Sequence, residues 1–232
     1  MSLTTSHFIM SDIDFLPSWT LLDSIMAQEE FLKRDKQLLI VPAFERLNVR
    51  GVADGGSPCD GGDCGEFLRE HEDYVPGERE GLKECVDSGD CIVFQSLDNK
   101  DGHGSTKSEV WLEGGTGGRV RELQCFESVR YEPYLVAPYC GTEGGVMYDE
   151  RFYGYGKNKI SYVSHVRHVG YHFGVLPDGF LVHFPHPKSL AKEKWLDGGV
   201  KHHGEMDRLY KEFNGQLKKR FGKTPVVPLC NV

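Results

Sequence analysis

The 232-residue sequence lacks a long apolar run and an excess of basic residues. No hydrophobic stretch approaches the ~20 residues that a helix needs to span a bilayer. Acidic residues outnumber basic ones by 35 to 27, which gives a formal net charge of −8. Such a chain has no positive field to attract phosphate backbones or anionic lipids. We therefore expect no membrane segment in this chain and no nucleic-acid partner.

Signatures of targeting, zinc binding and dinucleotide binding are also missing. The first residues have neither the basic nor the apolar region of a secretory signal, so we expect an internal location or a targeting segment upstream. The spacing of Cys59, Cys64, Cys85 and Cys91 includes no Cys-x-x-Cys pair, which argues against structural zinc. Seven cysteines cannot all pair within one chain. Glycine-rich residues 51–65 and 98–118 contain no dinucleotide fingerprint, and we expect surface loops there.

The front of the chain predicts two buried strands around a helix. Residues 7–15 favour a short strand that leads into two carboxylates and ends near Pro17, and residues 36–44 favour the second. Between them we expect a helix over residues 19–34, capped by Ser18. Its apolar stripe would consist of Leu22, Ile25, Met26 and Leu32.

The rest of the chain predicts a mixture of helices and strands. Hydrophobic periodicity and helix-ending residues favour helices over residues 79–87, 158–169 and 205–221, the second of which ends at Gly170. Extended segments are expected over 91–95 and on both sides of Glu132-Pro133. Residues 171–176 and 179–184 read as paired strands around a turn. The alternation predicts one mixed α/β domain over residues 1–232.

Asp12 and Asp14 form the most informative pair of acids. Two aspartates on alternate residues just after a strand can approach one hard divalent cation if the backbone turns there. The alternative is a solvated strand end. His183 and His186 lie in an apolar, alternating segment, and an imidazole can complete a Mn²⁺ site begun by carboxylates. The alternative for each histidine is a hydrogen bond to a backbone carbonyl.

Asp149 and Glu150 are candidates for a general base. They stand next to Arg151 in an aromatic setting, and transfer of a sugar with inversion needs a carboxylate that takes the acceptor hydroxyl's proton. The alternative is a salt bridge to Arg151. Aromatic rings that could stack on sugar faces are Tyr131, Tyr134, Tyr153 and Tyr155, and the alternative for most of them is a place in the core or at its rim.

Several ordered blocks of the sequence together resemble glycosyltransferase family 49, the LARGE-type and β-1,4-glucuronyltransferase-type enzymes. The blocks are Ser11-Asp12-Ile13-Asp14-Phe15-Leu16-Pro17-Ser18, Val41-Pro42-Ala43-Phe44-Glu45, Tyr131-Glu132-Pro133-Tyr134, the run from Tyr148 to Lys159, Gly170-Tyr171, Val175-Leu176-Pro177, and Phe180-Leu181-Val182-His183-Phe184-Pro185-His186. They extend over most of the chain, and the two glycine-rich stretches fall outside them.

The resemblance implies a GT-A-like fold, a mixed sheet flanked by helices. Asp12 and Asp14 would be the metal-binding pair, and His183 the matching ligand from the later part of the chain. Mn²⁺ would bridge the diphosphate of a UDP-sugar, typically UDP-glucuronate. The sugar would pass with inversion to a glycan acceptor, with Asp149 or Glu150 as the base. Members of the family usually reside in the Golgi.

The chain begins only about ten residues before Asp12, where GT-A enzymes carry a nucleotide-binding α/β segment first. The resemblance therefore implies an N-terminally truncated domain, and a second reading stays open. In that reading the chain is a non-catalytic remnant, or a glycan-binding or scaffold module without a donor site. A third reading is a metal-dependent hydrolase that uses the same side chains without UDP.

Overall fold

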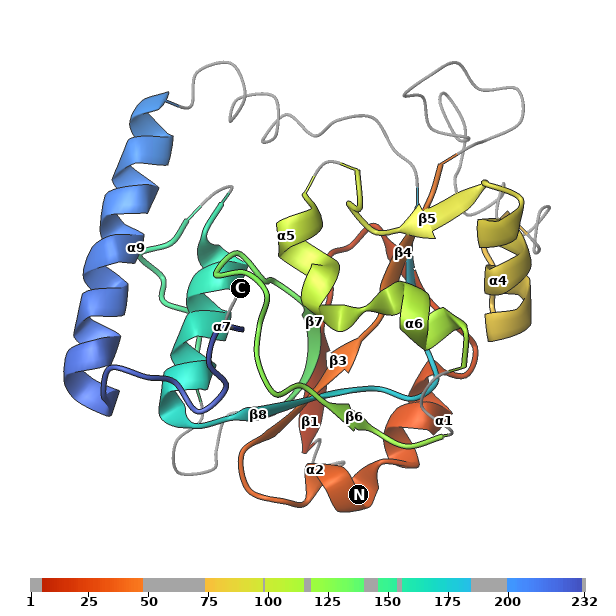
Figure 1. The fold of residues 1–232 in the computed structure, drawn as a ribbon, viewed down its shortest axis with the longest axis horizontal. Coiled ribbons are helices and arrows are strands. Elements are labelled where there is room, and N and C mark those ends of the chain that lie inside the picture. Colours follow the sequence, from red (N-terminus) through yellow and green to blue (C-terminus); the bar gives the residue numbers. More distant parts are fainter. Residues whose placement is uncertain are drawn as a thin grey trace, which may run out of the picture.

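The structure is a computed structural model that describes residues 6–47, 74–97, 99–114, 118–139, 146–153, 156–184 and 200–230. Two mixed β-sheets form its centre, with helices around them (Figure 1). The five-stranded sheet has the order β1 (His7–Met10), β7 (Tyr134–Pro138), β3 (Gln37–Val41), β8 (His172–Val175) and β6 (Arg121–Glu122). The four-stranded sheet has the order β2 (Phe15–Pro17), β9 (Leu181–His183), β4 (Ala43–Arg46) and β5 (Cys91–Val93).

The chain passes from one sheet into the other at Pro42. Every residue of β3 is buried, as expected for a central strand covered on both faces. Pro42 separates β3 from β4, and its carbonyl accepts the N–H of Leu181 (2.9 Å) at the start of β9. β3 runs parallel to β8, and β4 runs parallel to β9. The expected single strand over residues 36–44 is therefore two strands in two sheets.

The predicted pairing of residues 171–176 with 179–184 is wrong. β8 pairs with β3 and β6, whereas β9 pairs with β2 and β4. The chain changes sheets at the Pro177–Gly179 turn instead of folding back as a hairpin. Gly179 has φ +81°, and a Cβ there would lie 2.8 Å from the Cα of Leu21, so the turn packs too closely on the first helix for a side chain.

The helices are short except for two at one end of the molecule. They are α1 (Leu21–Met26), α2 (Glu29–Leu32), α4 (Arg79–Asp87), α5 (Lys100–His103), the 3₁₀ helix η2 (Gly104–Thr106), α6 (Ser108–Leu112), α7 (Asn158–Val169) and α9 (Val200–Phe221). α7 and α9 lie side by side (Figure 1). The predictions for α4 and α7 are confirmed, and Gly170 ends α7 at φ +106°. α9 begins earlier than expected.

The expected helix over residues 19–34 is broken into α1 and α2. Leu22 and Met26 of the predicted apolar stripe are exposed, and Ile25 packs in the core with Leu21. No side-chain hydrogen bond caps α1, so the capping role expected of Ser18 is also wrong. The Ser18 hydroxyl instead accepts the N–H of Phe180 (3.1 Å), which ties this segment to the turn before β9.

The surface loop expected over residues 98–118 is largely helical and forms part of the core. α5, η2 and α6 occupy most of its described residues (Figure 1). Trp111 is fully buried, and its indole N–H donates to the carbonyl of Leu176 (2.7 Å). The expected strand over 7–15 likewise divides into β1 and β2, with a turn at Ile13 and Asp14. The other expected loop, 51–65, lies outside the described residues.

Two disulfides link distant or neighbouring parts of the described chain. Cys85 of α4 is bonded to Cys91 of β5, so these two cysteines are not zinc ligands. The bond from Cys125 to Cys230 joins residues 105 positions apart and fixes the C-terminal segment against the sheet. Disulfides persist in oxidising compartments and are rare in the cytosol. Cys59 and Cys64 lie outside the described residues.

Candidate functional site

Asp12 lies in the turn between β1 and β2, where two other elements reach its carboxylate. The β1–β7 pairing aligns Met10 with Leu135, which brings Tyr134 beside the turn. The Tyr134 hydroxyl donates to Asp12 Oδ2 (2.9 Å), and Lys159 from the first turn of α7 forms an ion pair with the same oxygen. Burial, followed by the charge of Asp12, raises the pKa of Tyr134, so its hydroxyl keeps its proton.

The Asp14 carboxylate contacts the imidazole of His183 on the neighbouring strand, β9. In the β2–β9 pairing Phe15 stands opposite His183, and the N–H of Phe184 donates to the carbonyl of Asp14 (2.8 Å). As a result the His183 Nε2 lies 3.3 Å from Asp14 Oδ2. The imidazole packs against the rings of Phe15 and Phe94, with centroids 5.2 and 5.3 Å away. The structure thus brings together two of the three predicted metal ligands.

The third predicted ligand, Asp12, is turned toward Lys159. Among the residues that the structure describes, no three His, Cys, Asp or Glu side chains converge as a metal site. The donor types nevertheless suit Mn²⁺, because carboxylates and an imidazole are ligands that it accepts. Asp14 and His183 already face each other, and Asp12 is two residues away. A cation shared by all three would compete with the Lys159 ammonium for the negative charge of the Asp12 carboxylate, whose Oδ2 forms the ion pair.

An open pocket of about 280 Å³ lies beside the Asp12 carboxylate. Its lining residues are Ile9, Met10, Ser11, Asp12, Pro133, Tyr134, Tyr148 and Lys159. The Tyr148 ring stacks on Tyr162 of α7, with centroids 4.7 Å apart, and burial raises the pKa of its hydroxyl to about 12. We call this space the Asp12 pocket. It combines a carboxylate, an ammonium and two phenol rings.

Two further charged or polar groups near this pocket were not identified from the sequence. Glu132 accepts a hydrogen bond from Asn99 Nδ2 (3.2 Å), and burial raises the pKa of its carboxyl. His103 is buried, and its ring stacks on Tyr134 with centroids 5.8 Å apart. Burial lowers the pKa of His103 to about 3, so the imidazole is neutral. The Glu132-Pro133 pair was a visible signal, whereas His103 lay in a segment expected to be a loop.

The two candidate bases have different surroundings. Asp149 accepts hydrogen bonds from Arg151 Nε (2.9 and 3.1 Å) and Nη2 (2.5 Å), so the salt bridge weighed as an alternative is formed. Arg151 lowers the pKa of Asp149. Glu150 is exposed in the adjoining turn. Both acids follow directly after Tyr148, which lines the Asp12 pocket, and the choice between them stays a prediction.

The remaining predicted site residues are dispersed. Tyr131 is fully buried in the core, where its hydroxyl shares a hydrogen bond with Thr106 (2.7 Å), so it does not stack on a sugar. Tyr153 is exposed, with 61% of its surface accessible. His186 and Tyr155 lie outside the described residues. No helix in the described part of the chain is long and apolar enough to cross a membrane.

Comparisons with known proteins identify the family of the chain. The family described as "Glycosyl-transferase for dystroglycan" matches residues 1–222. The chain is 30% identical over 221 residues to the mouse xylosyl- and glucuronyltransferase LARGE2, covering 94% of this chain and 27% of that protein. It is 27% identical over 222 residues to human LARGE1, covering 95% and 25%.

The chain therefore spans about a quarter of the length of these curated relatives. Its two mixed sheets flanked by helices are compatible with a GT-A-like domain. Because the family match extends over nearly the whole sequence, the resemblance to glycosyltransferase family 49 is confirmed. The chain therefore belongs to this glycosyltransferase family.

Proposed function

We propose that the Asp12 pocket is the transfer site of a metal-dependent, inverting glycosyltransferase. In this proposal a sugar, typically glucuronate, passes from a UDP-sugar to a glycan acceptor. The observation that carries the proposal is the contact between Asp14 and His183 (3.3 Å), which the β2–β9 pairing creates next to Asp12. The names of the relatives, xylosyl- and glucuronyltransferases, support a sugar nucleotide as donor.

Asp12, Asp14 and His183 would hold Mn²⁺. When bound, the ion supplies positive charge that stabilises the leaving diphosphate. Lys159 has a part of its own in the proposal. It holds the Asp12 carboxylate while the metal is absent, and after release its ammonium can approach the diphosphate or the uronate carboxylate of the donor. Tyr134 keeps its hydrogen bond to Asp12 and so limits how far that carboxylate turns.

The acceptor hydroxyl would lose its proton to Asp149 or Glu150. Asp149 is deprotonated at neutral pH, but the pair with Arg151 lowers its pKa and so makes this carboxylate a weaker base than it would be without Arg151. The Glu150 side chain forms no hydrogen bond or ion pair within the described residues, and its carboxylate is exposed to an incoming acceptor. Tyr148 offers an aromatic face next to these acids, suited to the apolar side of a sugar ring.

We also propose that the protein resides in the Golgi lumen. Two disulfides among the described residues favour an oxidising compartment of the secretory pathway. A non-catalytic glycan-binding module remains the second candidate. The observation that favours it is the ion pair between Lys159 and Asp12, since a permanent pair would keep metal away from that carboxylate.

A transfer assay tests the proposal. The purified chain is incubated with UDP-glucuronate or UDP-xylose and a glycan acceptor, with Mn²⁺ or with a chelator. We expect a product only with metal, and NMR should show the anomeric configuration inverted relative to the donor. Saccharide binding without transfer under any of these conditions would favour the non-catalytic module. Metal-dependent hydrolysis that does not need UDP would favour the hydrolase reading.

A further inference from the structure

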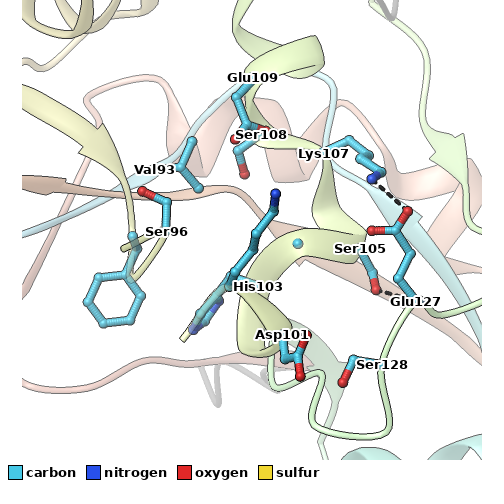
Figure 2. A pocket seen from close by; sticks show the side chains of 13 residues that line it. Val93, Ser96, Asp101, His103, Ser105, Lys107, Ser108, Glu109, Glu127 and Ser128 are labelled. Carbon is cyan, nitrogen blue, oxygen red and sulfur yellow. Dashed lines mark hydrogen bonds and ion pairs between the residues drawn. The ribbon is translucent and has the colours of Figure 1, made fainter. Parts of the chain in front are cut away.

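A second pocket of about 230 Å³ lies between the helical segment α5–η2–α6 and the turn at Glu127 and Ser128 (Figure 2). His103 lines this pocket, and its ring stacks on Tyr134, which lines the Asp12 pocket. The two stacked rings therefore stand between the two pockets. We call the second one the serine pocket, because Ser96, Ser105, Ser108 and Ser128 are among its lining residues.

The wall of the serine pocket is fixed by hydrogen bonds before any ligand arrives. The Ser105 hydroxyl accepts the N–H of Glu127 (2.9 Å), and Lys107 Nζ forms an ion pair with Glu127 Oε1 (2.6 Å). Figure 2 shows Glu127 and Ser128 on one side of the pocket and Ser96 on the other. Behind the wall, Arg121 donates to the carbonyl of Thr106 (2.5 Å). A preformed site loses less entropy on binding.

Several polar groups of this pocket remain available. Within the described chain, the side chains of Lys100, Asp101 and Glu109 form no hydrogen bond or ion pair, nor do the hydroxyls of Ser96 and Ser108. The pocket thus offers an ammonium and hydroxyls as donors, and carboxylates and hydroxyls as acceptors. A ligand with many hydroxyl groups, each able to donate and accept, matches this mixture.

Charge balance and volume narrow the class of ligand. Two lysines, Lys100 and Lys107, face three acids, Asp101, Glu109 and Glu127, so the pocket has no surplus positive charge for an anionic ligand. Its volume is below the ~300–1,000 Å³ of pockets that hold drug-sized molecules, which suits a single sugar ring.

We propose that the serine pocket binds one neutral monosaccharide unit of the glycan acceptor, away from the unit that receives the new sugar. This inference rests on the proposed function, because the ligand is identified as part of the acceptor glycan. Contacts to a remote unit of the substrate select the acceptor and contribute binding energy that the transfer step uses. The pocket would then set which glycans are elongated without touching the reacting atoms.

Saturation-transfer NMR tests this directly in the absence of UDP and metal. The probes are methyl β-xyloside and methyl β-galactoside as neutral sugars, and methyl β-glucuronide as the anionic comparison. The proteins are the full chain and its Asp14→Asn variant, whose transfer activity should be lost. We expect the neutral glycosides to bind both proteins alike. If the unaltered chain binds the neutral glycosides but transfers no sugar in the transfer assay, the proposed function fails while the proposed sugar site in the serine pocket stands.

Two variants locate the site. Ser96→Tyr should fill the pocket and weaken neutral-glycoside binding by about tenfold or more. Glu109→Gln removes the charge of one hydrogen-bond acceptor with little change of shape, and should weaken neutral-glycoside binding by a smaller factor. This variant keeps the test decisive if Ser96→Tyr folds poorly. The control is Glu84→Gln, an exposed acid of α4 that does not line the pocket, which should bind as the parent does. No transfer of saturation to either neutral glycoside, stronger binding of the glucuronide, or binding unchanged in both pocket variants would each overturn the proposal.

Discussion

Replacement of Lys159 by methionine should strengthen Mn²⁺ binding in the absence of donor. Methionine keeps much of the length and apolar stem of lysine but removes the ammonium that occupies Asp12. If Asp12, Asp14 and His183 form the metal site, the incoming ion competes with this ammonium for the Asp12 carboxylate in the parent chain. In Lys159→Met the Asp12 carboxylate keeps the hydrogen bond from the Tyr134 hydroxyl (2.9 Å) and no ion pair within the described residues.

The expected gain follows from the exposure of the ion pair. The Lys159 and Asp12 side chains retain 27% and 43% of their accessible surface, so solvent weakens their attraction. Pairs of this kind contribute about 0.2–1 kcal/mol. Since 1.4 kcal/mol corresponds to a tenfold change, Mn²⁺ should bind up to about fivefold more tightly to Lys159→Met.

The assay is a Mn²⁺ titration followed by electron paramagnetic resonance of the free ion. The control is Lys83→Met, which breaks the ion pair with Glu113 (3.0 Å) on another face and should leave the Mn²⁺ affinity unchanged. The same Lys159→Met protein should show a higher KM for the UDP-sugar, because a cation near the diphosphate is lost. Mn²⁺ affinity equal to or weaker than that of the parent chain would refute the proposed competition between Mn²⁺ and Lys159 for Asp12.

Three other predictions concern the base, a disulfide and a buried histidine. Asp149→Asn or Glu150→Gln should lower turnover by about two to four orders of magnitude with Mn²⁺ binding unaffected; steady-state kinetics test this, and normal turnover in both would place the base elsewhere. Cys125→Ser combined with Cys230→Ser opens a loop of 105 positions and should lower the free energy of unfolding by roughly 2–5 kcal/mol in urea titrations; an unchanged value would contradict the tethering role of the bond. Burial lowers the pKa of His103 from 6.5 to about 3, so between these pH values the imidazole is protonated in the unfolded chain and neutral in the folded chain. Stability should therefore be lost as the pH falls below about 6.5 toward 3, at up to ~1.4 kcal/mol per pH unit from this group. His103→Phe, which keeps an aromatic ring between its neighbours, should reduce that slope, and an identical slope in both proteins would show that the buried imidazole is not its source.

The sequence predicted those parts of the fold that local pattern determines. The bounds of α7 followed from its composition and from Gly170, whose positive φ ends the helix. Residues 171–176 and 179–184 were recognised as extended, but their partners were not. Their separation into two sheets depends on parallel pairing with β3 and β4, more than a hundred residues earlier, which no local signal records.

In the candidate site, too, the residue types could be recognised from local sequence, whereas contacts between distant elements could not. Asp12, Asp14 and His183 were recognised as a set of possible ligands, and the contact of Asp14 with His183 is present. The ion pair of Asp12 with Lys159 was not foreseen, because it depends on where α7 begins relative to β1. The buried positions of His103 and Trp111 were not predicted, because they lie in a glycine-rich segment whose helices are too short to show a clear hydrophobic periodicity.

Calorimetric titration of UDP into the purified chain, with and without Mn²⁺, tests the central claim most directly. The parent chain and Asp14→Asn are compared, since this variant removes one anionic ligand with little change in side-chain size. We predict UDP binding that requires Mn²⁺ in the parent chain and is lost in Asp14→Asn. Absence of UDP binding to the parent chain, or metal-supported binding that Asp14→Asn retains in full, would contradict the assignment of this site to sugar transfer.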